Sequence, residues 1–272
     1  MLFIQLVKAN LSTQTFGKEI EHYIRLESTN DEAFKLIGEG FGEGTVVITD
    51  HQTAGKGTQG RKWFSAPGKG LTFSIILTPN LPIQQGGLLS LLAGLATAQA
   101  MEQLKLEPTL KWPNDLLLSG RKFGGILVES KIQGDIMTHA VIGIGINVNE
   151  SKMEFPEDIR ETATSIAIEK GASVQRELVL AWMLNTLEKW YTTLKSQETT
   201  SIISTWQTRC AHLGKEVSFT YKDETTYGLF RGVDEDGKAI IKTDTEQIIL
   251  SSEEISLNLG WSDIRSAIVL EC

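Results

Sequence analysis

The chain contains few of the residues that build disulfide frameworks, metal clusters or membrane spans. Its 272 residues include only two cysteines, Cys210 and Cys272, which lie far apart and lack the spacing of a metal site. This pattern excludes a disulfide-rich scaffold and favours a reducing, cytoplasmic compartment. The apolar stretch around 88–100 is too short and too mixed with polar residues to span a bilayer, so no membrane association is expected. No signal peptide is expected either.

The chain also lacks an excess of positive charge, since 34 acidic residues outnumber 26 lysines and arginines and the net charge is −8. The pI is accordingly low, at 5.2. Such a chain is a poor candidate for binding nucleic acid, and too few residues precede Tyr23 for a separate DNA-binding domain. Residues 51–101 are the exception, since they contain Lys56, Arg61, Lys62 and Lys69 but no acidic residue. This basic segment suits a small anionic ligand such as a nucleotide, although a chance gap in acidic residues is the alternative.

The residue pattern predicts one α+β domain over 1–212 and a small all-β unit over 213–272. Strands are predicted at 23–26, 45–49, 71–77, 110–112, 116–118, 123–130 and 136–148. Helices are predicted after the capping residues Ser28, Thr29 and Asn30, and over 88–106 and 177–194. Short strands separated by turns from residue 214 to 259 predict a barrel of about five strands.

Residues 55–60 match the glycine pattern of a dinucleotide-binding loop, but their context argues against that fold. Pro67 with its flanking glycines disfavours the required helix, and no acidic residue occurs between Gly60 and Glu102 to bind a ribose. The glycines still allow backbone N–H groups to approach an anion. With Lys56, Arg61 and Trp63 nearby, the loop is a candidate anion site. The alternative is a solvated surface loop.

Two further segments carry charged or amide side chains between apolar strands. Asn114 and Asp115 follow Pro113 and present the oxygens that Mg²⁺ prefers, although a turn held by their side chains is an equal alternative. Lys122 precedes a pair of glycines, where it could reach a carboxylate or a phosphate. A lysine near a hairpin is usually only solvent-exposed, so by itself Lys122 is weak evidence.

Residues 143–147 combine an apolar face with a face that has almost no side chains. Because strand side chains alternate, Gly143, Gly145 and Asn147 share one face and the isoleucines share the other. Two alternating glycines weaken a strand, so we expect that something lies flat against them. Close packing of a neighbouring helix is the alternative.

Taken in order, these segments resemble the biotin protein ligase family. The resemblance is to its monofunctional type, which has no N-terminal DNA-binding domain. The resemblance covers about 23–259 and includes Ser28-Thr29-Asn30, Gln52, the loop 55–63 and the segments 111–115, 122–129 and 143–147. It implies a mostly antiparallel sheet with helices on one side, related to class II aminoacyl-tRNA synthetases, and a C-terminal SH3-like domain. It implies ATP-dependent formation of biotinyl-5′-AMP, with Mg²⁺, and transfer of biotin to a lysine of a biotin carboxyl carrier protein. A homodimer is compatible with the resemblance, but the sequence does not decide the oligomeric state.

The resemblance also assigns roles to particular residues. Lys122 and Arg61 are the implied catalytic residues, and Asp115 is the implied Mg²⁺ ligand. Biotin would contact Ser28, Thr29, Asn30, Gln52, Gly55, Lys56, Trp63, Lys122 and Gly125. ATP would contact Lys56, Arg61, Lys111, Asn114, Asp115, Gly125, Ile126 and Asn147. The role of residues 261–272 is not indicated.

One departure from the family concerns the charge of the loop, which is usually richer in arginine. Lys56 and Thr58 stand at positions often occupied by arginine, and Thr58 carries no charge at all. We therefore hypothesise that this chain retains its adenylate less tightly than more basic relatives.

Three rival functions fit the sequence less well than biotin ligation. A lipoate or octanoate ligase or transferase shares the fold, but its glycine motif differs and an alkyl tail suits the polar residues 28–30 less well. A biotin sensor without transfer is disfavoured by Lys122, Asn114 and Asp115. A DNA-binding repressor would need an additional N-terminal domain.

Overall fold

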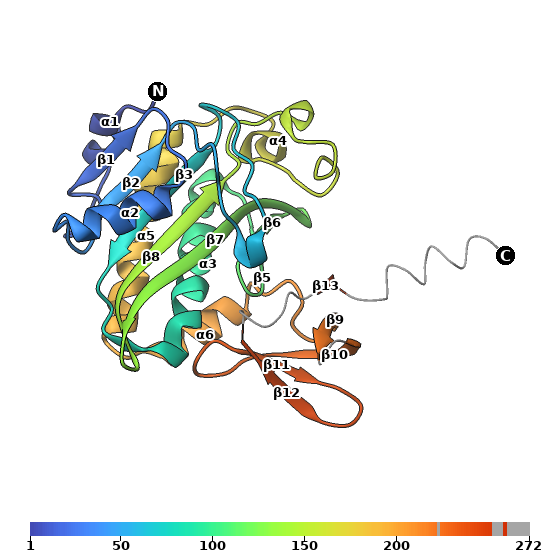
Figure 1. Ribbon diagram of the computed structural model, residues 1–272. Coiled ribbons are helices and arrows are strands. Elements are labelled where there is room, and N and C mark those ends of the chain that lie inside the picture. Colours follow the sequence, from blue (N-terminus) through green and yellow to red (C-terminus); the bar gives the residue numbers. More distant parts are fainter. Residues whose placement is uncertain (222–223, 252–257, 260–272) are drawn as a thin grey trace.

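The computed structural model describes residues 1–221, 224–251 and 258–259. They form a large unit built on one sheet and a smaller β unit beside it (Figure 1). The first sheet has the order β1-β2-β3-β8-β7-β6-β5, with β4 paired to β8. Its strands are β1 (Ile20–Tyr23), β2 (Val46–Thr49), β3 (Leu71–Leu77), β4 (Leu81–Pro82), β5 (Thr109–Lys111), β6 (Asp115–Leu118), β7 (Arg121–Gln133) and β8 (Ile136–Ile146). Only β1 and β2 pair in parallel, so the predicted antiparallel character is confirmed.

Helices cover both faces of this sheet. The helices are α1 (Ile4–Ala9), α2 (Thr29–Gly38), α3 (Gly86–Met101), α4 (Ile166–Lys170), α5 (Arg176–Lys195) and α6 (Thr199–Gln207). Helices α3, α5 and α6 pack in one layer with the main core, and α3 is buried on nearly every side. None of the helices in the described ranges is long and apolar enough to cross a membrane.

The expectation that helices lie on one side needs a correction, because α2 packs on the opposite face. Ala33 and Leu36 of α2 contact Val47, Ile76 and Val141 in a separate apolar cluster. The neighbours of these strand residues, such as Val46 and Ile75, belong to the main core on the other face. Strand β2 is buried at all four positions and therefore needs cover on both faces.

The C-terminal unit is an antiparallel sheet of five strands in the order β12-β11-β10-β9-β13, which confirms the predicted all-β character. Its strands are β9 (Glu216–Tyr221), β10 (Glu224–Val233), β11 (Ala239–Lys242), β12 (Gln247–Leu250) and β13 (Asn258–Leu259). The turn between β10 and β11 contacts the large unit, because the Trp112 indole N–H donates to the Gly237 carbonyl over 3.0 Å. Residues 261–272, whose role the sequence leaves open, lie outside the described residues.

The position of the first strand differs from the prediction of 23–26. Strand β1 ends at Tyr23, and Leu26 contributes only an isolated bridge to Gln52. All four β1 residues are only partly buried, and the following Ile24 is 67% exposed. An edge strand with this mixed pattern gives no clear alternation in the sequence, so its limits cannot be read from it.

The strand register gathers small residues at one place on the sheet. Ser74 pairs with Gly143 and Thr72 pairs with Gly145, while Gly125 of β7 pairs with Gly145 from the other side. The sheet therefore has a patch almost without side chains, opposite the layer of α3 and α5, and the functional cavity opens over it.

Candidate active site

A cavity of about 540 Å³ lies over the small-residue patch. Its walls are the first turn of α2, the glycine loop 55–63, the start of β7 and the segment 156–163. Its size falls in the range of small-molecule and cofactor sites. Most of the residues predicted for the site line it, namely Ser28, Thr29, Asn30, Gln52, Lys56, Arg61, Trp63, Asn114, Lys122, Gly125, Ile126 and Asn147. Gly55, Lys111 and Asp115 are not among its lining residues.

One end of the cavity is a buried, uncharged polar network that we call the polar floor: Ser28, Thr29, Asn30, Gln52 and Ser74. The Thr29 backbone N–H donates to Gln52 Oε1 over 2.9 Å. The Ser74 hydroxyl lies 2.7 Å from Thr29 Oγ1 and 2.6 Å from Asn30 Oδ1. All five residues are buried, so these bonds satisfy polar groups that would otherwise be costly to bury.

Helix capping explains part of the floor. Ser28 is the N-cap of α2, because its side chain accepts a hydrogen bond from the Asp31 backbone N–H over 3.3 Å. The cap directs Thr29 and Asn30 into the sheet, where Asn30 Nδ2 donates to Glu129 Oε2 over 2.7 Å. The capping prediction is confirmed, and the same turn also lines the cavity.

Sequence reasoning missed Ser74 and Glu129 as members of this site. Ser74 looks like an ordinary member of a buried strand, and only its bonds to Thr29 and Asn30 show that it supports the cavity from beneath. Glu129 lies on β7 and reaches the site through Asn30. Neither residue could be found from the sequence, because their contacts depend on strand register and on the packing of α2.

The alternating glycines of β8 are needed for close packing on the cavity side. A Cβ atom at Gly143 would overlap the Asn30 side chain, and one at Gly145 would overlap the Trp63 indole. At Gly125 an added Cβ would approach Lys122 and the Trp63 ring to 3.4–3.5 Å. The expectation of a flat neighbour holds at Gly145, where the neighbour is the Trp63 ring, whereas at Gly143 the alternative of close helix packing applies, because Asn30 belongs to α2.

The glycine loop is a small closed hairpin, and it does not lead into a helix. Trp63 N donates to Gly55 O over 2.9 Å, and Gly57 N donates to Arg61 O over 2.7 Å. Between them η1 (Thr58–Gly60) makes one tight turn. A Cβ at Gly55 would lie 2.6 Å from the Gln52 amide nitrogen, so glycine is required there. This geometry confirms the exclusion of a dinucleotide-binding loop.

The loop cations are engaged with nearby groups. Lys56 Nζ lies 2.6 Å from Asp31 Oδ1 at the start of α2, and this hydrogen bond raises the pKa of Lys56. The Arg61 guanidinium folds back onto Thr58, with Nη2 donating to Oγ1 over 3.0 Å and Nε donating to the carbonyl oxygen over 3.2 Å. Both cations are at least partly exposed, so an anionic ligand can compete for them.

At the other end of the cavity, Asp115 stands between two lysines. Lys122 Nζ forms an ion pair with Asp115 Oδ1, and Lys111 Nζ lies 3.6 Å from Oδ2. The three residues come from β7, β6 and β5, so the sheet fixes their spacing. Lys122 Nζ also lies 6.0 Å from the centroid of the Trp63 ring. The carboxylate holds the Lys122 ammonium group at the edge of the cavity, and Lys111 pairs with the same carboxylate from outside the lining.

Two of the three predicted asparagines, Asn114 and Asn147, use their side chains to join backbone segments. Asn114 Nδ2 donates to Ile126 O over 2.7 Å and ties the turn before β6 to β7. Asn147 Nδ2 donates to Thr164 O over 3.0 Å and ties the end of β8 to the segment 156–165. Sequence reasoning missed this segment, which has no regular pattern. It reaches the site because Lys122 N donates to Thr162 O over 2.8 Å.

The metal prediction rests on Asp115 alone. No group of three or more His, Cys, Asp or Glu side chains that could hold a metal ion occurs within 1–221 and 224–251. Both Asp115 oxygens face lysines. These residues fit Mg²⁺ only if most of its ligands come from water and phosphate, which is how Mg²⁺ commonly binds with nucleotides.

A second cavity of about 1100 Å³ lies on the other side of the glycine loop. Its walls include the start of α3, strand β7 and the β10–β11 turn at Asp236, Gly237 and Lys238. Residues 56–58 and 61–63 line both cavities. The loop is therefore a partition, with the C-terminal unit facing only its outer side.

Comparison with known proteins agrees with the fold. Residues 23–147 match the model of the Biotin/lipoate A/B protein ligase family, and residues 212–257 match the Biotin protein ligase C terminal domain. The two units thus match a class of enzymes that ligate small acids to proteins.

Individual relatives narrow this class. The bifunctional ligase/repressor BirA of Bacillus subtilis is 33% identical over 252 residues, which cover 92% of this chain and 78% of that protein. The biotin--[acetyl-CoA-carboxylase] ligase of Paracoccus denitrificans is 29% identical over 236 residues, which cover 85% of this chain and 97% of that protein. The biotin protein ligase of Aquifex aeolicus in complex with biotin and ATP superposes with a TM-score of 0.77 at 30% identity, over 89% of this chain and all of that one. The chain belongs to the biotin protein ligase family.

Proposed function

We propose that this chain joins biotin to a lysine of a carrier protein in two steps, with ATP as co-substrate and biotinyl-5′-AMP as intermediate. The observation that carries the proposal is the polarity of the 540 Å³ cavity, which has an uncharged polar floor at one end and Lys122 with Arg61 elsewhere in its wall. Donors and acceptors without charge suit a ureido ring, and cations suit a carboxylate and phosphates. The domain 1–212 would carry both ligand sites, and 213–272 would assist.

In the first step, a biotin carboxylate oxygen attacks the α-phosphorus of ATP, a C–O–P anhydride forms and pyrophosphate leaves. The two reactants are anions that repel each other. Lys122 and Arg61 reduce this repulsion and stabilise charge on the phosphoryl oxygens. Arg61 would exchange its bonds to Thr58 for bonds to phosphate, and Lys56 would neutralise charge at the same loop.

In the second step, the amine of the carrier lysine attacks the acyl carbon, an amide bond forms and AMP leaves. The anhydride is prone to hydrolysis, so the cavity must exclude water until the carrier arrives. The glycine loop covers the cavity, and the Trp63 ring packs against Gly145 beneath it. Lys111 and Asp115 would hold Lys122 in place at the edge where the carrier lysine enters.

Magnesium would bind with the nucleotide, next to Asp115, and would supply positive charge to the phosphates. Asn114, Ile126 and Asn147 would contact the nucleotide at the wall formed by β7 and β8. The proposed acceptor is a biotin carboxyl carrier protein, which is consistent with the name of the Paracoccus relative. Cytoplasmic location and homodimer formation remain expectations from the sequence.

Native mass spectrometry tests the first step and its specificity. The protein is incubated with MgATP and equal amounts of biotin, lipoate and octanoate, and the retained adenylate is identified by mass. We expect biotinyl-adenylate alone. A retained lipoyl- or octanoyl-adenylate would move the chain to the lipoate branch of the family, and retained biotin without adenylate would indicate a sensor. Transfer to a recombinant biotin carboxyl carrier domain then tests the second step.

A further inference from the structure

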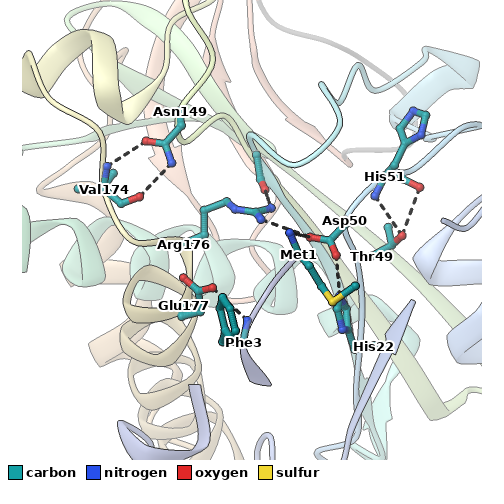
Figure 2. Close-up of polar contacts among 11 residues, drawn as sticks. Met1, Phe3, His22, Thr49, Asp50, His51, Asn149, Val174, Arg176 and Glu177 are labelled. Carbon is teal, nitrogen blue, oxygen red and sulfur yellow. Dashed lines mark hydrogen bonds and ion pairs between the residues drawn. The ribbon is translucent and has the colours of Figure 1, made fainter. Parts of the chain in front are cut away.

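A buried arginine outside the cavity joins the two ends of the segment that covers it. Arg176 is the first residue of α5, and its side chain is only 9% exposed. Its Nη1 donates to Gly70 O over 3.0 Å, and its Nη2 lies 3.3 Å from Asp50 Oδ1 (Figure 2). Asp50 follows β2 and Gly70 precedes β3, so the segment 51–69 begins and ends at this one guanidinium group.

Other bonds strengthen the same junction. Gly68 N donates to Asp50 O over 2.9 Å, which brings the two ends of the segment together directly. His22 Nε2 lies 2.9 Å from Asp50 Oδ2 and holds the carboxylate from β1. Asp50 is therefore held by an arginine and a histidine while its side chain is 10% exposed. A buried carboxylate needs such partners, because an unpaired buried charge is strongly unfavourable.

The second segment that covers the cavity starts at the same place. Asn149 N donates to Lys69 O over 3.2 Å. The Asn149 side chain exchanges two hydrogen bonds of 2.9 Å with the Val174 backbone, two residues before Arg176 (Figure 2). Beyond Asn149 the chain forms the wall that contains 156–163. Both covers of the cavity are therefore attached to the start of α5.

Glu150 adds a buried acid to this junction. It is 1% exposed, and no side chain among the described residues forms a hydrogen bond with its carboxylate. A Cβ atom on Gly70 would lie 2.7 Å from Glu150 Oε1, so the carboxyl group packs directly against the residue that Arg176 holds. Arg176 thus bonds to Asp50 and Gly70, and Glu150 packs against Gly70 at the same junction.

We propose that Arg176 is a positioning residue that fixes the closed state of the glycine loop and thereby sets how long the adenylate is retained. The identity of the adenylate in this proposal rests on the proposed function, but the contacts of Arg176 do not depend on it. A loop of this length has many open conformations, and holding both ends at one point reduces them. A ligand that binds only the closed state is retained in proportion to the population of that state.

The test compares the full-length protein with Arg176→Met, Arg176→Lys and a matched control, Glu43→Gln. Glu43 accepts bonds from Tyr191 and Thr78 at the far end of α5, so its loss should lower stability without touching the junction. Thermal unfolding gives the stability of each variant. Two rates are then measured, the tryptic cleavage of the ligand-free loop at Lys56, Arg61 and Lys62 and the release of biotinyl-adenylate.

We expect Arg176→Met to raise both rates by about tenfold, the effect of losing a charged hydrogen bond. Arg176→Lys should be intermediate, because a lysine retains the charge near Asp50 but cannot bridge to Gly70 at the same time. It also serves as the readout if Arg176→Met does not fold. Glu43→Gln should lower the melting temperature and leave both rates unchanged.

Wild-type rates in Arg176→Met or Arg176→Lys, or equal increases in Glu43→Gln, would overturn the proposal and leave Arg176 a purely structural residue. The cleavage rate separates this result from a failure of the proposed function. If no biotinyl-adenylate forms but cleavage still accelerates in the Arg176 variants alone, the positioning role stands and the ligand assignment fails.

Discussion

The polar floor and the glycine loop face the same cavity but are built differently. Floor residues are buried, and apart from Ser28, which caps α2 through Asp31, they bond to partners 23 to 99 residues away in the sequence. The loop is more exposed, and its Arg61 bonds to Thr58, only three residues away. The floor therefore exists whenever the domain is folded, while the loop conformation is a local equilibrium. We infer that the floor determines which acid is recognised, whereas the loop determines how long the product stays.

The largest effect should come from Lys122, which belongs to neither region and acts on the reaction itself. Lys122→Ala should lower kcat/KM for adenylate formation by about a thousandfold, because a preorganised charge near the phosphoryl oxygens is lost. Pyrophosphate release measures this. Lys131→Ala on the same strand is the control, since Lys131 Nζ lies over the Phe34 ring, 5.6 Å from its centroid, and outside the cavity. A loss of less than tenfold would remove Lys122 from the proposed mechanism.

Glu150 should make the junction below the loop sensitive to pH. Burial raises the pKa of Glu150 to about 7. Between pH 4.5 and 7 the folded state then binds more protons than the unfolded state, so this group destabilises the fold as the pH rises. Arg176 opposes this effect by its charge, and Glu154 adds to it.

Glu150→Gln removes that titration. The substitution should increase the free energy of unfolding by about 3 kcal/mol more at pH 8 than at pH 5. Urea unfolding of the wild type and the variant at both pH values measures this. Glu161→Gln, at an exposed residue, is the control. An equal change in stability at the two pH values would show that Glu150 does not titrate in this range.

A methyl group in the cavity would test the recognition role of its small-residue patch. Gly145→Ala should raise the Kd for biotin by about thirtyfold, because the new Cβ displaces the Trp63 indole and overpacking typically costs ~2 kcal/mol. Isothermal titration calorimetry measures this. Gly38→Ala is the matched control, since an added Cβ there would meet nothing within 4 Å. Unchanged affinity in Gly145→Ala would separate the patch from recognition.

The smallest effect should come from charge in the loop. Thr58→Arg should slow biotinyl-adenylate release by about tenfold, because a guanidinium adds a charge-assisted bond to the phosphate. Thr58→Ala is the comparison, since it removes only the one bond that Arg61 makes to the threonine side chain. An unchanged release rate in Thr58→Arg would contradict the hypothesis that the uncharged Thr58 weakens retention of the adenylate.

The sequence predicts those parts of the site whose pattern is local. Alternation in 143–147 identifies the face with two glycines, and Ser28 identifies both a helix start and a cavity wall. Strand β3 is predicted at its observed limits because every residue is buried and the flanking residues are turn formers. In these cases the residues that determine the local structure are neighbours in the sequence.

The remaining parts depend on contacts between distant segments. Ser74 supports Thr29 and Asn30 because of the register between β3 and β8, and Arg176 matters because α5 begins beside Asp50 and Gly70. The placement of α2 on the opposite face of the sheet also follows from packing, since its sequence is compatible with either face. No local pattern contains this information.

The self-contained loop also bears on how such enzymes can diversify. Its backbone bonds close within the segment 55–63, so substitutions at Lys56 or Thr58 leave the core packing untouched. Product residence time can therefore evolve by single changes in the loop, while the floor conserves the choice of substrate. A lineage could in this way acquire a fast-releasing or a long-holding enzyme from the same scaffold.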